Sequence, residues 1–481
     1  MIAVRYCLWE LDKHIEKGYN YTMRIPSKIN PKTLTILKDI KKAGGKPYII
    51  GGWVRDLIMG INSKDVDVEC FNITAKKLEF VLRKHTSNVD AVGMAFGIFK
   101  VDMRKEGGDE LDFSLPRTEN KEGQGHKGFI VEIDPTITLK EAASRRDITC
   151  NSMFYDPFLQ EVIDFYGGIE DIHNKIIRHT SKAFMEDPLR VLRIMQFAAR
   201  FSFVVATETI NLSKFMITEF DSLAKERILI EFNKMLQKGK YISLGLDVLV
   251  QTGWISKFPV LDALRSTPQE PAHHPEGNAW DHTLHTIDAA RVITDKLNVL
   301  YAALLHDVGK PATTEVKDGK IISHAHDIMG EEPARQFLDS IGMKETYLIE
   351  RIIPLVREHM AHVHNRNPSK RAVRRLARRL HPCTITELLM IMEADHDGRP
   401  PLKGGLPKEA IQIREIAKDL QVESQAPKEI LLGRHLIERG MNPSPKFGDI
   451  LRDAFEAQLD GVFNNLEEGQ VWLDKYITDV L

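Results

Sequence analysis

Two aspartates at alternate positions, Asp65 and Asp67, stand out as chemical groups in the first part of the 481-residue chain. They belong to the run Asp65-Val66-Asp67-Val68, whose alternation predicts a strand with both carboxylates on one face and both valines in the core. Two neighbouring carboxylates repel each other unless a cation lies between them. Mg²⁺, which proteins commonly hold with one or two carboxylates and the phosphates of a substrate, is the expected occupant.

A glycine turn precedes this pair of aspartates. Ile49-Ile50 predicts a strand that runs into Gly51-Gly52, and the turn leads into a short helix that carries Arg55. Glycines let the backbone approach an anion closely, a helix N-terminus offers N–H groups, and Arg55 adds a positive charge. We therefore predict that these residues hold phosphate. A solvated turn with two surface acids is the alternative, but the position of the acids one short helix after the glycines favours a nucleotide site.

A third carboxylate is predicted beside the first two. In Leu111-Asp112-Phe113-Ser114-Leu115 the alternation buries the apolar residues and turns Asp112 to the opposite face. Helical patterns over residues 32–42 and 74–84 and a strand over residues 97–101 complete the elements that must position these acids.

The stretch from Ile49 to Asp67 resembles the signature of the polymerase-beta-like nucleotidyltransferases, class II branch, and in particular that of bacterial tRNA CCA-adding enzymes. The resemblance implies a small mixed sheet with helices, two Mg²⁺ ions, and transfer of a nucleoside monophosphate from an NTP to an RNA 3′ hydroxyl. It also implies that Asp112 helps to activate this hydroxyl. The glycine-rich, polar residues 120–128 predict a mobile loop or a plain surface hairpin. The resemblance places here the loop that full CCA-adding enzymes need for the final adenosine.

Two further segments resemble motifs of the same family. Arg145-Arg146-Asp147-Ile148-Thr149-Cys150-Asn151 is similar to the second motif, which implies that Arg146 contacts phosphate and that Asp147 and Asn151 lie near the sugar. Surface charge before a helix is the alternative for the two arginines. The helical segment Glu226–Phe232 continues the neck of the family and is interpreted as structural.

The segment Glu186-Asp187-Pro188-Leu189-Arg190 predicts a helix start, with Asp187, Arg190 and Arg193 along one face. Cytosine and adenine both present an amine donor beside a ring-nitrogen acceptor, so one carboxylate and one guanidinium can pair with either base. Guanine and uracil would leave polar groups unpaired. An N-cap and a solvated face are the alternative interpretation. The motif matches the protein template of CCA-adding enzymes, which implies base recognition by Asp187 and Arg190 and a phosphate-binding or supporting role for Arg193.

Histidines are concentrated in the second half of the chain, where twelve of the 18 lie between positions 273 and 396. Neutral imidazoles combined with carboxylates suit a divalent transition metal, which activates water for attack on phosphorus. The pattern resembles the HD phosphohydrolase domain that follows the transferase in some bacterial CCA enzymes. The resemblance implies a metal site, with Ni²⁺, Co²⁺ or Mn²⁺ as the expected ion, at His282, His306, Asp307, His326, His359 and Asp395. We interpret His285, His324, His362 and His364 as bystanders.

A basic helix is predicted after residue 369. Its cations form two i,i+4 rows opposite an apolar face, and we predict that they contact the phosphates of tRNA, although a basic face is often only solvated. The cations are Lys370, Arg371, Arg374, Arg375, Arg378 and Arg379.

The bulk composition excludes several classes of protein. A hydrophobic content of 43%, with 28% charged residues, is typical of a soluble globular protein, and the net charge of −2 requires that any RNA site come from local clustering. No apolar run reaches the length of a membrane span, and the four cysteines form no motif. We expect a cytoplasmic protein with reduced thiols that does not bind membranes; the sequence leaves the oligomeric state open.

Together the patterns predict an α+β fold: a polymerase-beta-like nucleotidyltransferase head followed by an all-α neck and body, an HD domain and a helical tail. The expected domains are an N-terminal extension (1–30), the head (31–175), the neck and body for nucleobase recognition and RNA binding (176–270), the HD domain (271–400) and the tail (401–481).

The predicted function is addition or repair of the tRNA 3′ CCA end with CTP and ATP, without a nucleic-acid template. The HD domain would add a metal-dependent phosphatase or 2′,3′-cyclic phosphodiesterase. The alternatives are a bacterial poly(A) polymerase, a CC-only enzyme, or an HD phosphohydrolase whose head merely binds nucleotide or RNA.

Overall fold

The computed structural model describes residues 21–480 except 28, 64, 94–96, 105–106 and 122–128. The predicted N-terminal extension therefore lies mostly outside the described residues, as does the loop predicted at 120–128. The chain divides into two compact units, one of residues 1–231 with 244–254 and one of residues 232–243 with 255–481. The division falls inside helix α8 (Lys225–Lys238), within the segment predicted as one neck and body.

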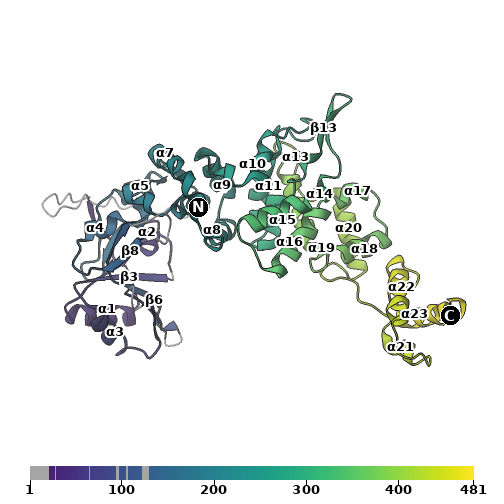
Figure 1. Cartoon of the computed structure of the whole chain (residues 1–481), viewed down its shortest axis with the longest axis horizontal. Helices are drawn as coiled ribbons and strands as arrows, with labels where there is room; N and C mark the ends of the chain where they lie inside the picture. The colour runs from purple at the N-terminus through teal and green to yellow at the C-terminus, as the bar shows by residue number, and fades with distance from the viewer. Residues whose placement is uncertain are drawn as a thin grey trace. The chain divides into compact units, whose positions relative to one another are not determined.

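The first unit is built on a mixed sheet of eight described strands (Figure 1). In spatial order they are β1 (Tyr21–Arg24), β10 (Glu161–Asp164), β9 (Phe154–Asp156), β2 (Lys46–Ile50), β3 (Asp65–Phe71), β6 (Glu110–Ser114), β5 (Ile98–Asp102) and β4 (Val89–Gly93). Strand β3 pairs antiparallel with β2 and parallel with β6. Val66 and Val68 are buried while Asp67 is half-buried, because alternate side chains of a strand face opposite ways.

Helices cover this sheet in two groups, which Figure 1 shows apart with strands between them. One group is α1 (Pro31–Lys42) and α3 (Ala75–Leu82), and the other includes α2 (Gly52–Ile58), α4 (Leu139–Ser144) and α5 (Gly168–His173). A hairpin of β7 (Arg117–Lys121) and β8 (Phe129–Ile133), a short pair of β11 (Ile176–Ile177) and β12 (Val204–Val205), and the helices α6 (Leu189–Phe201), α7 (Thr207–Phe215) and α9 (Ile242–Gln251) complete this part. The mixed sheet with helices confirms the predicted class of the head.

The second unit is helical. Its first part comprises α10 (Pro259–Asp262), α11 (Ala279–Ile293), α12 (Leu297–Leu305), α13 (Lys310–Thr313), the hairpin β13 (Thr314–Lys317) and β14 (Lys320–Ser323), α14 (His326–Met329), α15 (Glu331–Ser340), α16 (Thr346–Glu358), α17 (Ala361–His364), α18 (Lys370–Leu380), α19 (Ile385–Asp397) and α20 (Lys408–Asp419). Helix α12 is buried from Asn298 onward and packs against α11, α16 and α19. A helix that is apolar all round belongs in a core, so the residues that follow it are delivered to the centre of the unit.

The last three helices form their own apolar cluster. They are α21 (Gly433–Ile437), α22 (Lys446–Asp460) and α23 (Leu466–Val480). Leu436, Ile450, Phe463 and Leu473 are buried together there, and α22 also contacts α18. Among the described residues, no helix has the length and apolar character that a membrane span requires.

Candidate active sites

Three carboxylates meet on the paired strands β3 and β6. Asp67 lies opposite Asp112 in the parallel register, and Asp65 is two residues before Asp67 on the same strand. Burial raises the pKa of Asp67, and the charges of Asp112 and Asp65 also raise it, against Arg146 and Lys100. One oxygen of Asp112, Oδ1, is buried and has no hydrogen-bond partner within the described part of the chain. Three neighbouring carboxylates, one of them with a raised pKa, fit a divalent cation with oxygen ligands.

Gly51 borders the space between these carboxylates and Arg146. Its φ of 67° and ψ of −132° favour glycine, because other residues rarely adopt this backbone conformation. A side-chain carbon built on Gly51 would lie 3.7 Å from both Asp67 Oδ2 and Arg146 Nη1. The backbone of the glycine turn therefore lies where the carboxylate site and a cationic side chain adjoin.

Arg55 lies on α2 after the glycine turn, as predicted, and is buried there. Its guanidinium is only 3% exposed, donates to Asp56 and, at 2.6 Å, to Asn151 Oδ1, and lies over the ring of Phe201. Asn151 in turn donates from Nδ2 to Asp147 Oδ1 at 3.2 Å. Because Arg55 is buried in these contacts, its position does not support the prediction that it binds phosphate; it ties α2 to the second motif.

Asp147 joins that motif to helix α6. Its Oδ2 accepts hydrogen bonds from Arg193 Nε at 2.8 Å and Nη2 at 2.7 Å, and its Oδ1 accepts the backbone N–H of Ile148. Burial raises the pKa of Asp147, but the charge of Arg193 and the hydrogen bonds outweigh it and hold this pKa below its ordinary value. Asp147 is therefore a charged acceptor that fixes Arg193.

A pocket of about 360 Å³ adjoins this network. It is lined by Gly51, Gly52, Asp67, Arg145, Arg146, Asp147, Asn151, Asp187, Leu189, Arg190, Arg193 and Arg227. A second pocket of about 270 Å³ shares Arg145, Arg146 and Arg190 with it. The structure thus brings most of the predicted nucleotide-binding residues to one cavity, whereas Arg55, Asp65 and Asp112 do not line it.

The predicted pair for base recognition is held by protein contacts. Asp187 Oδ1 accepts the backbone N–H of Leu189 at 3.0 Å, as an N-cap does, and Oδ2 accepts from Arg227 Nη2 at 2.7 Å. Arg190 donates to the carbonyl oxygens of Ala183 and Arg145, each at 2.7 Å. Arg227, which was interpreted as structural, also lines this pocket. In the sequence, only its position next to Glu226 at the start of a predicted helix could have indicated a functional role.

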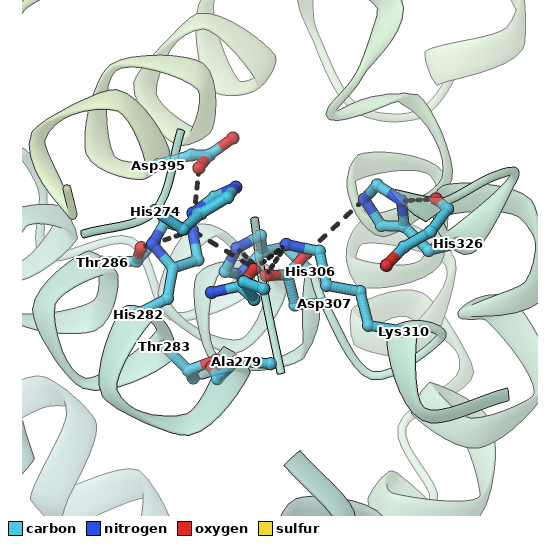
Figure 2. Close-up of polar contacts among 12 residues, drawn as sticks. His274, Ala279, His282, Thr283, Thr286, His306, Asp307, Lys310, His326 and Asp395 are labelled. Carbon is cyan, nitrogen blue, oxygen red and sulfur yellow. Dashed lines mark hydrogen bonds and ion pairs between the residues drawn. The ribbon is translucent and has the colours of Figure 1, made fainter. Parts of the chain in front are cut away.

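The second candidate site gathers the predicted histidines and acids around Asp307 (Figure 2). His306 Nε2 lies 3.3 Å from Asp307 Oδ2, and His326 Nε2 lies 3.5 Å from Asp307 Oδ1. Their potential ligand atoms fall into two adjacent groups, His282, His306 and Asp395 in one and Asp307, His326 and His359 in the other, each within 4.8 Å.

The ring orientations of three histidines suit metal ligands. The Nδ1 atoms of His306, His326 and His359 lie 2.7–2.8 Å from the carbonyl oxygens of Ala303, Ser323 and Val356, so Nδ1 carries the proton and Nε2 a lone pair. His326 Nε2 and His359 Nε2 then face each other at 3.2 Å. Burial lowers the pKa of His359 to about 3 and also lowers that of His326, so both rings are neutral. Two facing lone pairs repel each other unless a cation lies between them, and the site therefore fits a metal.

His282 lies between two carboxylates. Its Nδ1 is 2.8 Å from Glu276 Oε1 and its Nε2 is 2.9 Å from Asp395 Oδ1. Burial lowers the pKa of His282, but the hydrogen bonds with Asp395 and Glu276 outweigh it and raise this pKa to about 9. A metal ion bound by His282 and Asp395 would take the place of that proton, since imidazole binds metals in its neutral form.

Several other residues of this site were not among those predicted from the sequence. Glu276 bridges His274 Nδ1, at 2.9 Å, and His282, and Lys310 Nζ lies 2.6 Å from Asp307 Oδ2. His362, interpreted as a bystander, also lines the pocket. His274 and His362 belong to the histidine-rich segment of the sequence. Their spacing alone does not show whether a histidine binds a metal or only contacts a residue that does.

The basic rows of α18, which were predicted to contact tRNA phosphates, lie against other segments of the same unit. Arg371 Nε lies 2.9 Å and Arg375 Nη2 2.6 Å from Asp460 Oδ1 of α22, and Arg379 Nε lies 2.7 Å from Glu358 Oε1. Arg374 donates to Asn464, and Arg378 lies over the ring of Phe455. These cations meet the tail and α16 because acidic residues distant in sequence are packed there. The RNA-binding role of Lys370–Arg379 stays a prediction, because several of these arginines remain partly exposed beside their protein partners.

Comparisons with known proteins match both parts of the chain to known domains. Residues 47–178 match the model of the Poly A polymerase head domain, and residues 279–397 match that of the HD domain. The chain is 33% identical over 364 residues to the multifunctional CCA protein of Aliivibrio salmonicida, covering 73% of this chain and 85% of that protein. It is 32% identical over 372 residues to that of Pasteurella multocida, covering 74% and 84%.

Solved structures show the same fold. The CCA-adding enzyme of Bacillus stearothermophilus in complex with CTP has a TM-score of 0.63 at 20% identity, over 94% of this chain and 99% of that one. The Thermotoga maritima CCA-adding enzyme complexed with tRNA has a TM-score of 0.58 at 19% identity, over 94% and 97%. Fold and sites define a nucleotidyltransferase head joined to an HD domain. The chain belongs to the family of multifunctional CCA proteins.

Proposed function

We propose that the protein adds or repairs the 3′-terminal CCA of tRNA, using CTP and ATP, and that its HD domain is a second, metal-dependent phosphohydrolase. One observation carries the proposal: Asp187 and Arg190 line the same pocket as Asp67, so a donor–acceptor pair suited to cytosine and adenine adjoins the carboxylates. The names of the relatives support CCA addition over a poly(A) polymerase, a CC-only enzyme or a binding head. A cytoplasmic location is part of the proposal.

In the head, Asp65, Asp67 and Asp112 would hold two Mg²⁺ ions. When bound, the ions neutralise the triphosphate and favour ionisation of the RNA 3′ hydroxyl. Arg146 is placed to bind the triphosphate beside Gly51 and Gly52. The hydroxyl attacks the α-phosphate in line, and pyrophosphate leaves.

Base choice follows from the fixed positions of two side chains. Arg227 holds Asp187, and two backbone carbonyls hold Arg190, so the acceptor and the donor keep one geometry without a template strand. Asp147 and Asn151 line the pocket and would contact the ribose, while Asp147 also fixes Arg193. Guanine and uracil would leave this pair unsatisfied, and the cost of unpaired polar groups excludes them.

In the HD domain, two ligand groups would hold transition-metal ions such as Ni²⁺, Co²⁺ or Mn²⁺. When bound, such ions activate water for attack on phosphorus. The backbone carbonyls that accept from His306, His326 and His359 orient the Nε2 atoms inward. Phosphate monoesters and 2′,3′-cyclic phosphates are the proposed substrates of this phosphatase or cyclic phosphodiesterase.

Incubation with tRNA lacking CCA and each labelled NTP tests the transferase. We expect incorporation of C first and of A only after C, each as a single defined addition. Long A tails would indicate a poly(A) polymerase, C without A a CC-only enzyme, and no incorporation would contradict the proposal.

A further inference from the structure

Arg399 lines the HD pocket, and its Nε–H group has no hydrogen-bond partner among the described residues. It follows Gly398, whose carbonyl oxygen is 3.2 Å from His282 Nδ1, and it lines the same pocket as Asp395 and His362. Its Nε atom is buried and has no hydrogen-bond acceptor in the part of the chain that the structure describes. The charge of this side chain therefore lies in the pocket that holds candidate metal ligands, and no carboxylate of the described residues forms an ion pair with it.

Two other arginines of the same domain, Arg351 and Arg357, are paired with carboxylates. Arg351 Nη2 lies 2.6 Å from Glu387, and Arg357 Nη1 lies 3.1 Å from Glu331. A guanidinium stays charged at every physiological pH, and a buried N–H group without an acceptor is unfavourable. An unpaired guanidinium in a pocket is therefore explained if a ligand supplies the acceptor oxygens.

The other walls of the pocket indicate what kind of ligand that is. Ile321, Met360, Val363 and Met392 contribute an apolar surface. The pocket, at about 210 Å³, is smaller than the roughly 300–1,000 Å³ that encloses a drug-sized molecule. The pocket therefore suits the anionic end of a larger molecule, together with a neighbouring group that has both polar and apolar faces.

We propose that Arg399 binds the phosphate group of the phosphoester in this pocket, through charge-assisted hydrogen bonds to its non-bridging oxygens. The substrate class is a terminal nucleotide phosphate, monoester or cyclic, whose sugar lies against Met360 and Met392. The proposal rests on the HD site being a phosphohydrolase. Arginine is suited to this role because its planar fork matches phosphate oxygens.

The test measures binding of inorganic phosphate to the full chain. All variants carry Asp67→Asn, so that the head contributes as little as possible, and are loaded with Mn²⁺. Calorimetry gives the Kd of phosphate for the unchanged HD site, for Arg399→Gln and Arg399→Lys, and for the matched control Arg366→Gln, whose exposed side chain does not line the pocket. We expect Arg399→Gln to raise Kd about 10- to 100-fold, as loss of a charge-assisted hydrogen bond predicts, with a smaller rise for Arg399→Lys and none for the control.

A parallel assay follows hydrolysis of a 2′,3′-cyclic nucleotide and the affinity for Mn²⁺. A phosphate Kd that is unchanged in Arg399→Gln, no phosphate binding to the unchanged site, or a weakened Mn²⁺ affinity in Arg399→Gln would each overturn the proposal. If phosphate binding depends on Arg399 but no phosphoester is hydrolysed, the anion site stands and the hydrolase function fails. If hydrolysis proceeds with kcat and KM unchanged in Arg399→Gln, the hydrolase stands and the anion site fails.

Discussion

Replacing Asp147 with asparagine should destabilise the head and weaken nucleotide binding together. Asp147 is 7% exposed and accepts two N–H groups of Arg193, at 2.8 and 2.7 Å. The amide keeps one acceptor oxygen but no charge, so the Arg193 guanidinium would remain against the pocket without its counter-charge. The hydrogen bond that Asn151 Nδ2 donates to Asp147 Oδ1, at 3.2 Å, would be made to an uncharged amide in the variant.

The burial of this ion pair determines how much folding free energy the variant loses. Removing one partner of a buried ion pair costs about 3–5 kcal/mol. The Arg193 side chain is 33% exposed, so solvent screens part of the interaction and we expect the lower end, about 3 kcal/mol. Such a loss is a large fraction of a domain stability of about 5–15 kcal/mol.

The sign of the pH dependence follows from the lowered pKa of Asp147. A carboxyl whose folded pKa lies below its unfolded value of about 3.9 stabilises the fold above that pH. The stabilisation disappears as the pH falls through the lowered folded value. The difference between wild type and Asp147→Asn should therefore be full at pH 7 and shrink below pH about 4.

Hydrogen exchange of amides in α2 and α6 is the suitable assay, because the two units need not unfold as one. CTP binding is measured alongside, and Asp90→Asn, an exposed position on β4, is the matched control. If hydrogen exchange and CTP affinity in Asp147→Asn equal those of the control, Asp147 neither stabilises the head nor supports nucleotide binding.

Three further outcomes are expected. Asp187→Ala should lower the preference for CTP and ATP over UTP and GTP by about 10-fold or more, since loss of a pairing group removes discrimination between bases. Single-turnover rates with each NTP measure this preference, and unchanged ratios would exclude Asp187 from base choice. Arg374→Gln should leave the salt dependence of tRNA binding unchanged, because Arg374 donates a hydrogen bond to Asn464 of the tail. A plot of log affinity against log salt concentration whose slope is flatter by about one unit would support the RNA-contact hypothesis. His359→Ala should reduce bound Mn²⁺, measured by elemental analysis after dialysis, and full retention would remove His359 from the ligands.

The strands that carry the three carboxylates could be predicted because local alternation determines them. Alternation in Asp65–Val68 and in Leu111–Leu115 set which side chains face the core, and the parallel register then placed Asp67 opposite Asp112. The burial of Arg55 could not be predicted, because its partner Asn151 is 96 residues away and the local sequence suggests only a cation after a glycine turn.

The same limit explains the basic helix. Its amphipathic pattern correctly buries Val373 and Leu380, but the pattern cannot show what faces the arginines. Asp460, which pairs with Arg371 and Arg375, lies on a helix that sequence analysis assigned only to a tail. Contacts between segments distant in sequence decide whether a charged face is open, and periodicity carries no information about them.

The protein is expected to carry two chemistries in two separate sites, and one crossed measurement distinguishes them. CCA addition to tRNA and hydrolysis of a 2′,3′-cyclic nucleotide are assayed in wild type, in Asp67→Asn, and in a variant with His306→Ala and Asp307→Ala. We predict that Asp67→Asn loses only CCA addition and that the double variant loses only hydrolysis. Loss of both activities in both variants, or a wild type that hydrolyses no phosphoester with Ni²⁺, Co²⁺ or Mn²⁺, would contradict the account.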